Sequence, residues 1–234
     1  MPIYDDKLLY IHIPKTGGTS IEKYFEKKYK DITLKEWRDM RWEPHLTVKQ
    51  ISNLYPQYKI ENMEWIVSVR NPYDRIISAL FYQKKIDKFR YPILNKNIVE
   101  FEIIQYIHGD NPCNFKIPQH EFLINHDNLI KENIKIVKCE NLTEDMKKLG
   151  YDDFDVHENK NKTYHNKYSD LLSDKSIWYI NKYYEKDFDY FGYEKIKTKE
   201  YSYDFTLYYI LIIFLSVLFI CCIFYVQLSG IMEI

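Results

Sequence analysis

A strand-like segment that runs into a glycine loop and then into a helical pattern constrains the fold more than any other feature. Residues 7–13 suit a buried strand, and residues 14–20 read Pro-Lys-Thr-Gly-Gly-Thr-Ser. A helical pattern follows over residues 19–29. This order presents backbone N–H groups and the positive end of a helix to an anion. Two of the chain's 6 glycines lie in this loop, so a bound phosphate is the first hypothesis.

The order of residues within the loop narrows the kind of phosphate site. Pro14 stiffens the turn, and Gly17 and Gly18 allow the backbone to approach an anion closely. A Walker A motif places its lysine after the glycines, whereas Lys15 precedes them in this chain. The order therefore argues against an ATPase or kinase of that class. The alternative without a ligand is an ordinary tight turn between a strand and a helix.

A second segment joins a strand to a helix at an arginine. Residues 64–70 are rich in β-branched side chains and predict a strand that ends at Arg70. Asn71 is a typical N-cap, and the proline after it suits the first position of a helix over residues 73–85. Arg70 offers a planar fork to a phosphate, and Ser78 lies about two turns into the helix. The alternative is a plain capped helix with Arg70 in a salt bridge.

The other predicted elements continue the alternation of strands and helices. They are helices over 48–55 (after a capping box at Thr47), 98–107, 142–149 (closed by Gly150) and 174–188, and a strand over 134–139. This alternation predicts an α/β fold with a central parallel sheet flanked by helices. Ligands bind at the carboxyl ends of strands in such sheets, and both Lys15 and Arg70 fall there.

Together the two segments resemble the sulfotransferases that depend on 3′-phosphoadenosine-5′-phosphosulfate (PAPS). The similarity is to the carbohydrate group that includes heparan sulfate 2-O-sulfotransferase, and it covers roughly residues 7–195. The resemblance implies a P-loop-like sulfotransferase fold. It also implies an enzyme that moves a sulfuryl group from PAPS to an acceptor hydroxyl, with a carbohydrate as the expected acceptor.

The resemblance assigns both motifs to PAPS. In that family the first motif is the 5′-phosphosulfate loop, and the second motif with its downstream serine binds the 3′-phosphate. The residues assigned in this way are Lys15, Thr16, Gly17, Gly18, Thr19, Ser20, Arg70, Ser78 and, as the basic residue of a late loop, Lys162. The hydroxyls of Thr19 and Ser20 are also expected to cap the helix that follows the loop.

The implied reaction needs charge stabilisation and a base. Sulfuryl transfer resembles phosphoryl transfer, in which positioning dominates, and Lys15 would neutralise charge on the leaving phosphate. No metal is required by this scheme. His45 is the candidate base, because it lies just before a capped helix whose positive end favours neutral imidazole. The alternative for His45 is a turn histidine bonded to the backbone.

Four other polar residues near these motifs have weaker assignments. Glu22 is a second candidate base, although an exposed helix carboxylate is the plainer interpretation. His12 lies in strand-like sequence and is interpreted as structural. Gln119 and His120 are expected to contact the acceptor.

The last part of the chain is strongly apolar. Residues 205–228 carry no charge and are long enough to span a bilayer, although a buried core helix is the alternative. We therefore expect a catalytic domain over 1–195, a juxtamembrane linker over 196–204, a transmembrane helix over 205–228 and a short tail over 229–234. Lysines 195, 197 and 199 favour a cytosolic domain, whereas the family resemblance favours the Golgi lumen.

Composition limits the partners of the chain. The net charge of −1, from 33 basic and 34 acidic residues, gives no general attraction for nucleic acid. No metal-ligand spacing links the cysteines at 113, 139, 221 and 222. The expected partners are a hydroxyl-bearing glycan and a membrane. Two other functions stay open: a nucleotide-dependent phosphotransferase, and a non-catalytic membrane-anchored protein that binds a nucleotide or a partner with the same fold.

Overall fold

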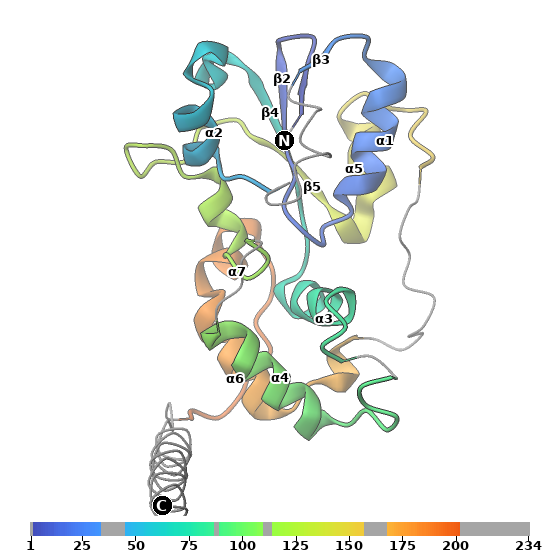
Figure 1. Cartoon of the computed structure of the whole chain (residues 1–234), viewed down its shortest axis with the longest axis vertical. Helices are drawn as coiled ribbons and strands as arrows, with labels where there is room; N and C mark the ends of the chain where they lie inside the picture. The colour runs from blue at the N-terminus through green and yellow to red at the C-terminus, as the bar shows by residue number, and fades with distance from the viewer. Residues whose placement is uncertain (1, 34–44, 87–88, 110–113, 157–167, 202–234) are drawn as a thin grey trace, which may run out of the picture. The chain divides into compact units, whose positions relative to one another are not determined.

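A five-stranded sheet in the order β3-β1-β2-β4-β5 forms the centre of the computed structural model (Figure 1). Strands β2 (Leu8–Ile11), β4 (Glu64–Val69) and β5 (Lys135–Lys138) run parallel. Strand β1 (Ile3–Tyr4) pairs antiparallel with β2, and β3 (Ile32–Thr33) pairs antiparallel with β1. The prediction of a parallel sheet is confirmed for β2, β4 and β5. It is wrong for the edge formed by β1 and β3, whose strands are too short to give a periodic signal.

The structure describes residues 2–33, 45–86, 89–109, 114–156 and 168–201. The chain divides into two compact units, Met1–Lys199 and Glu200–Ile234, and every named element lies in the first. No helix within the described ranges is long and apolar enough to cross a membrane. The run over 205–228, which was predicted as a transmembrane helix, lies outside the described residues.

Helices follow most strands, as predicted. The α-helices are α1 (Gly18–Lys28), α2 (Val48–Leu54), α3 (Pro72–Tyr82), α4 (Lys96–His108), α5 (Leu142–Lys148), α6 (Asp174–Tyr183) and α7 (Glu185–Phe191). The short 3-10 helices are η2 (Pro56–Tyr58), η3 (Ile60–Asn62), η4 (Gln119–Leu123), η5 (Cys139–Asn141) and η6 (Tyr168–Leu171). The single helix predicted over 174–188 is instead two, because the backbone leaves the helical region at Tyr184 (φ −105°, ψ 23°).

Alternation along the strands divides the core between the two faces of the sheet. Leu9 and Trp65 point to one face, where they pack with residues of α2 and η4. Tyr10 and Ile66 point to the other face, where they pack with residues of α1 and α5. Figure 1 shows α1 and α5 on one side of the sheet and α2 on the other. The central strands are therefore buried on both faces, as parallel strands usually are.

The starts predicted for α2 and α3 from their capping residues are confirmed. The hydroxyl of Thr47 accepts from the Gln50 amide at 3.2 Å, and the Gln50 side chain accepts from the Thr47 amide at 2.7 Å, which completes a capping box. The Asn71 side chain accepts from the Tyr73 amide at 3.0 Å at the start of α3. These caps fix where α2 and α3 begin, next to His45 and Arg70 respectively.

Helices α3, α4 and α6 pack on one another beyond the sheet. Figure 1 shows them at the end of the sheet where β4 runs into α3. The register sets Ile11 of β2 opposite Val67 of β4, and Val67 opposite Ile136 of β5. The three carboxyl ends therefore open toward this helical layer, which is where the predicted site residues lie.

Candidate active site

The loop between β2 and α1 holds an unusual backbone. Lys15 has φ 69° and Gly17 has φ 85°, both in the left-handed region. Gly17 occupies the N-cap position of α1, so the prediction that Thr19 or Ser20 caps this helix is wrong. The Ser20 amide donates to the Gly17 carbonyl at 3.0 Å. The amides of Gly18 and Thr19 lie in the first helical turn, where N–H groups lack intrahelical acceptors and favour an anion.

A buried chain of hydroxyls supports the loop from below. The Thr16 hydroxyl donates to the Ile13 carbonyl at 2.8 Å and lies 2.8 Å from the Ser68 oxygen. The Ser68 oxygen lies 2.6 Å from the Tyr10 hydroxyl, and burial raises the pKa of Tyr10 well above its usual value. The side chain of Thr16 is therefore occupied within the fold, and only its backbone can serve a ligand.

The two loop glycines are required by their neighbours. A Cβ at Gly17 would lie 3.3 Å from the Cys139 Sγ, on top of the strain of its left-handed φ. A Cβ at Gly18 would lie 2.2 Å from Cδ2 and 2.3 Å from Nε2 of His12. The ring of His12 thus occupies the space that a side chain at position 18 would need.

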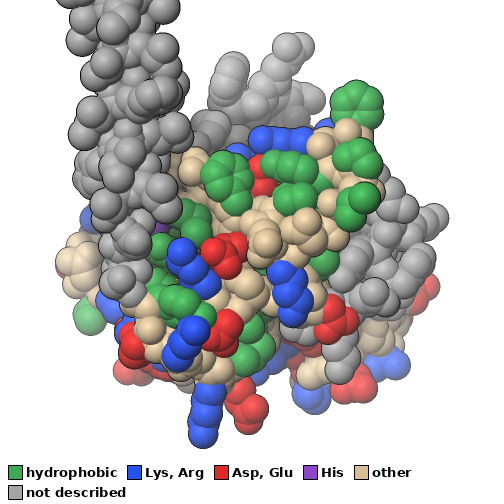
Figure 2. Space-filling view, turned by 90° about the horizontal axis from the view of Figure 1, so that it is seen from below, with side chains coloured by type: hydrophobic (Ala, Val, Ile, Leu, Met, Phe, Trp, Pro, Cys, Tyr) green, Lys and Arg blue, Asp and Glu red, His purple; other side chains and the backbone are tan. Residues whose placement is uncertain are grey.

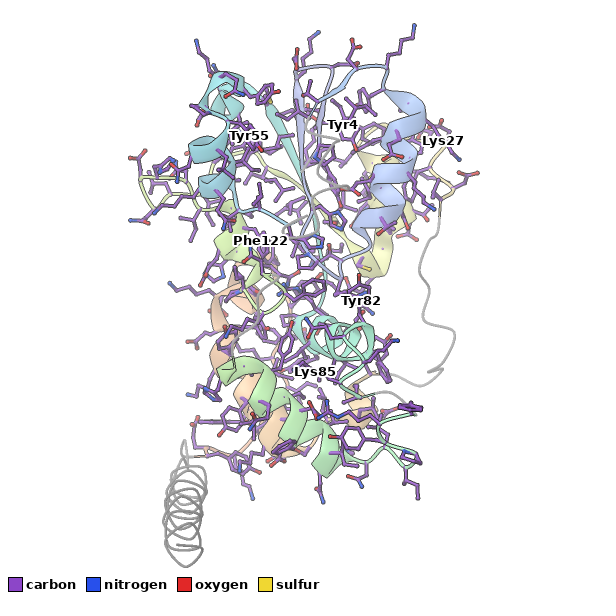
Figure 3. The ribbon with its side chains drawn as sticks, in the orientation of Figure 1. Tyr4, Lys27, Tyr55, Tyr82, Lys85 and Phe122 are labelled. Carbon is purple, nitrogen blue, oxygen red and sulfur yellow. The ribbon has the colours of Figure 1, made fainter. Side chains whose placement is uncertain are left out.

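Lys15 lies beside an aromatic ring and an arginine. Its Nζ is 4.0 Å from the centre of the Tyr82 ring, a distance typical of a cation–π contact. Burial, and then the neighbouring Arg70, lower the pKa of Lys15 to about 8. The Nη1 of Arg70 donates to the Lys15 carbonyl at 3.4 Å. The two predicted motifs therefore meet at one place, and Figure 3 shows Tyr82 between α3 and the end of the sheet.

The backbone around Arg70 is held by two side chains from distant segments. The amide of Gln119 spans Arg70: its Oε1 accepts from the Arg70 N–H at 2.9 Å, and its Nε2 donates to the Arg70 carbonyl at 2.8 Å. Glu140 accepts from the Asn71 amide at 2.7 Å. The guanidinium of Arg70 also lies 5.3 Å from the Tyr168 ring. Gln119 is fully buried and its amide is bonded to Arg70, which argues against the acceptor contact expected of it.

Arg75 is a second arginine of the same motif, and its structural role was not predicted from the sequence. Its guanidinium donates to the carbonyls of Pro14 (3.2 Å), Ile117 (2.9 Å) and Phe115 (2.9 Å), and it is almost fully buried. It therefore holds the loop between β2 and α1 against α3. The one available signal was its place on the apolar side of the helix, five residues after Arg70.

His45 is buried against the end of β2. Its Nδ1 lies 3.0 Å from the His12 carbonyl, which accepts only, so Nδ1 carries the proton and Nε2 keeps its lone pair. Burial, and then the neighbouring His12, lower the pKa of His45 to about 3. The ring is therefore neutral at neutral pH and has the tautomer that a base acting through Nε2 needs.

Two aromatic rings connect His45 to Lys15. The Phe115 ring meets His45 edge-on with centroids 5.5 Å apart, and it stacks on Tyr82 at 5.5 Å and 13°. Tyr82 in turn lies under the Lys15 ammonium. The expected base and the expected charge-stabilising group thus flank one aromatic wall, of which Tyr82 is mostly exposed.

The remaining predicted residues have different positions. Ser78 is half-buried on α3, two turns from its start, and Thr19 is half-buried in the first turn of α1. Lys162 lies outside the described residues.

The Nδ1 of His120 lies 2.7 Å from Asp187, and its ring is mostly buried, so it packs inside the domain and is not placed to meet an acceptor. Glu22 is not an exposed carboxylate, because it pairs with His12 at 2.8 Å.

On the face that Figure 2 shows, the charges of the described residues do not form one dominant patch. Figure 2 shows a face where basic, acidic and apolar side chains are interspersed. Within the described ranges, no three His, Cys, Asp or Glu side chains are grouped as a metal site would require.

Comparison with protein families gives a single finding that covers most of the chain. A family model described as "Sulfotransferase family" matches residues 4–194. The match includes both motifs, the strands and helices that carry them, and His45. Searches of curated proteins and of solved structures give no match.

Proposed function

The chain belongs to the sulfotransferase family, and on that premise we propose that it moves a sulfuryl group from PAPS to a hydroxyl of a carbohydrate. The observation that carries the proposal is that the Lys15 loop and Arg70, two elements suited to an anion, meet at neighbouring strand ends. The Arg70 guanidinium reaches the Lys15 carbonyl at 3.4 Å. A ligand with phosphates at two positions, as in PAPS, would engage both elements at once.

The loop and Lys15 would hold the phosphosulfate end of PAPS. The amides of Gly18 and Thr19 at the start of α1 suit the 5′-phosphate. Lys15 would leave the Tyr82 ring for the bridging oxygen and neutralise the charge that builds there as the sulfur–oxygen bond breaks. Bound anion would favour the ammonium form of Lys15, whose pKa is lowered in the free protein.

Arg70 and Ser78 would hold the 3′-phosphate and so select PAPS over ATP. Arg70 suits this role because Gln119 holds both its backbone N–H and its backbone carbonyl. With the backbone fixed, only the side chain has to adjust for the guanidinium to meet a phosphate. Ser78 lies two turns along α3, on the helix that Arg70 precedes. Lys162 remains a proposal from the family resemblance as a further phosphate contact.

His45 would act as the base. Its Nε2 would take the proton of the acceptor hydroxyl while the acceptor oxygen forms a bond to sulfur and the sulfur–oxygen bond to the phosphate breaks. The products are then the sulfated acceptor, adenosine 3′,5′-bisphosphate and one proton, which His45 passes to solvent. The tautomer of His45, with its proton on Nδ1 and a lone pair on Nε2, supports this role.

The acceptor and the location of the enzyme are finer parts of the proposal. Similarity of the two motifs to the carbohydrate group, including heparan sulfate 2-O-sulfotransferase, supports a glycan acceptor. The uncharged run over 205–228 supports a membrane anchor, with the domain on the cytosolic side by charge or in the Golgi lumen by family. Protease treatment of intact microsomes distinguishes the two orientations, because only a cytosolic domain is digested without detergent.

A radiolabelled sulfuryl-transfer assay tests the proposal. The full chain is incubated with ³⁵S-labelled PAPS and a panel of glycans, lipids and tyrosine peptides. We expect label to enter a glycan hydroxyl, with loss of transfer in His45→Ala and in Lys15→Ala. Arg90→Ala is a matched control, since this half-exposed arginine pairs with Glu102 away from the loop. Transfer by His45→Ala at the wild-type rate would remove His45 as the base, and transfer only to peptides or lipids would contradict the glycan acceptor.

A further inference from the structure

Glu22 and His12 lie next to the proposed base in a way that neither residue's sequence context predicted. We propose that they form a positioning pair for His45: Glu22 fixes the His12 ring, and His12 fixes the direction of the His45 Nε2. This inference rests on the proposed function, in which His45 is the base. It assigns a role to His12, whose strand-like sequence indicates a structural residue, and to Glu22, which is otherwise a second candidate base.

The Glu22–His12 contact is short and sheltered. The Nδ1 of His12 lies 2.8 Å from a Glu22 carboxylate oxygen, and the two side chains are only 12% and 14% exposed. A carboxylate accepts and cannot donate, so it holds the His12 proton on Nδ1 and fixes the plane of the ring. Glu22 extends from the second turn of α1, and His12 follows directly after β2.

His12 contacts His45 in two independent ways. Its backbone carbonyl accepts from the His45 Nδ1 at 3.0 Å. Its ring meets the His45 ring edge-on, with centroids 4.6 Å apart and an interplanar angle of 80°. The hydrogen bond sets the tautomer of His45, and the ring contact limits how far the His45 ring can tilt. One residue thereby controls both properties that a base acting through Nε2 needs.

The His12 ring packs against the loop between β2 and α1. The ring lies over Gly18, where any Cβ would come within 2.3 Å of it. Gly18 begins α1, the helix that also carries Glu22. The placement of the base is therefore tied to the loop proposed to bind the 5′-phosphate. A base and an anion site fixed by the same segment keep the reacting groups in register, which lowers the entropic cost of reaching the reactive geometry.

Hydrogen exchange at His45 tests the positioning role without an acceptor. The full chain, labelled with ¹⁵N-histidine and held in detergent micelles, is studied by NMR, and His45 is assigned from its missing signal in His45→Gln. We expect a slowly exchanging Nδ1–H in the wild type. We expect exchange roughly tenfold faster in Glu22→Ala, because a loosened His12 ring allows His45 to tilt away from its carbonyl partner. Glu22→Gln keeps an acceptor for the His12 proton and should restore slow exchange.

Two further variants keep the test decisive. Glu26→Ala removes a carboxylate one turn further along α1 and should leave His45 exchange unchanged. His12→Phe keeps a ring over Gly18 but loses the bond to Glu22, and should match Glu22→Ala. Circular dichroism identifies any variant that fails to fold, and the folded ones decide. Slow exchange in folded Glu22→Ala and His12→Phe would overturn the positioning role.

A transfer measurement separates this inference from the proposed function. With a working acceptor, Glu22→Ala should lower kcat while its affinity for adenosine 3′,5′-bisphosphate stays within about twofold of the wild type, and Glu22→Gln should recover most of the rate. If no acceptor takes up sulfate, or if His45→Ala is fully active, the proposed function fails. The exchange data would still show whether Glu22 and His12 hold His45.

Discussion

Lys15 lies half-buried beside the Tyr82 ring and the Arg70 guanidinium, and burial and the arginine make its ammonium form less stable. Burial and Arg70 lower its pKa to about 8, so the free protein holds an ammonium that is easily lost just above neutral pH. The left-handed backbone at Lys15 adds strain, which the Arg70 and Arg75 contacts to this loop offset. A bound anion would therefore stabilise the charged form of Lys15 strongly.

The charge of Lys15 predicts how ligand affinity depends on pH. Below about pH 8 the ammonium is present and binding is full, whereas above it the free protein must first take up a proton. We therefore expect the affinity for adenosine 3′,5′-bisphosphate to fall by up to tenfold per pH unit between about pH 8 and 9.5. Calorimetric titration across this range measures it. Lys15→Gln should bind more weakly at pH 7 and show a flat profile, and a wild-type profile as flat as the variant's would contradict this role.

The lowered pKa of His45 leads us to expect that the free energy of unfolding also depends on pH. Its pKa is about 3 in the folded protein, where it faces His12 and the Glu22 carboxylate beyond, and about 6.5 when unfolded. Above pH 6.5 both states are neutral and the fold keeps its full stability. As pH falls from 6.5 toward 3, only the unfolded state gains the proton, so stability falls by up to about 1.4 kcal/mol per pH unit.

Urea unfolding at pH 7, 6 and 5 measures this contribution. His45→Gln cannot take up the proton, so its free energy of unfolding should decline less steeply with acid than that of the wild type. Equal slopes for the two proteins would show that His45 is not held neutral by the fold.

Local sequence signals and distant contacts differ sharply at the residue scale. The positions of Lys15, Arg70 and His45 in the fold were predictable because each adjoins a strand end or a helix cap that the sequence marks. Gln119 was not, because its bonds to Arg70 cross 49 residues of chain. The bond from Glu22 to His12 joins residues ten apart on a helix and after a strand, and no helical or strand period connects such a pair.

At the scale of elements, the turn from β2 into α1 depends on Gly17. This residue is the N-cap of α1 at φ 85°, and its neighbours leave little room for a side chain. Gly150, with φ 87° at the end of α5, is a matched control because none of the described residues lies within 4 Å of a Cβ placed there. We expect both Gly→Ala changes to lower the free energy of unfolding by about 1–2 kcal/mol through backbone strain.

Ligand binding separates the two glycines. Gly17→Ala should also weaken the binding of adenosine 3′,5′-bisphosphate, since the strain distorts the proposed phosphate loop, whereas Gly150→Ala should bind normally. Thermal unfolding and calorimetric titration of both variants provide the comparison. Normal binding of adenosine 3′,5′-bisphosphate by Gly17→Ala would show that this turn does not contribute to the ligand site.

Elements with strong local signals were predicted well. The capping residues Thr47 and Asn71 located the starts of α2 and α3, and β-branched residues located β4. The two-residue strands β1 and β3 were missed, because their pairing comes from the tertiary fold and not from local pattern. The break between α6 and α7 at Tyr184 was missed too, since the buried Phe188 and Phe191 continue an apolar pattern across it.

At the scale of the whole domain, parallel pairing explains why one ligand would meet both motifs. Ile11 and Val67 lie opposite each other near the ends of β2 and β4, so the residues that follow each strand emerge side by side. Lys15 and Arg70 are 55 residues apart in sequence and meet for this reason. The expected fold class followed from the order of strands and helices, whereas the aromatic wall of Phe115 and Tyr82 required three-dimensional packing.

A thermodynamic cycle on the 3′-phosphate tests most directly whether the two motifs hold one bisphosphorylated nucleotide. Calorimetry compares adenosine 3′,5′-bisphosphate with adenosine 5′-monophosphate, on the wild type and on Arg70→Ala. We predict that the wild type binds the bisphosphate at least roughly tenfold more tightly, and that this preference disappears in Arg70→Ala while the monophosphate affinity barely changes. Equal loss of both ligands in Arg70→Ala, or equal affinity of the wild type for both, would contradict the account.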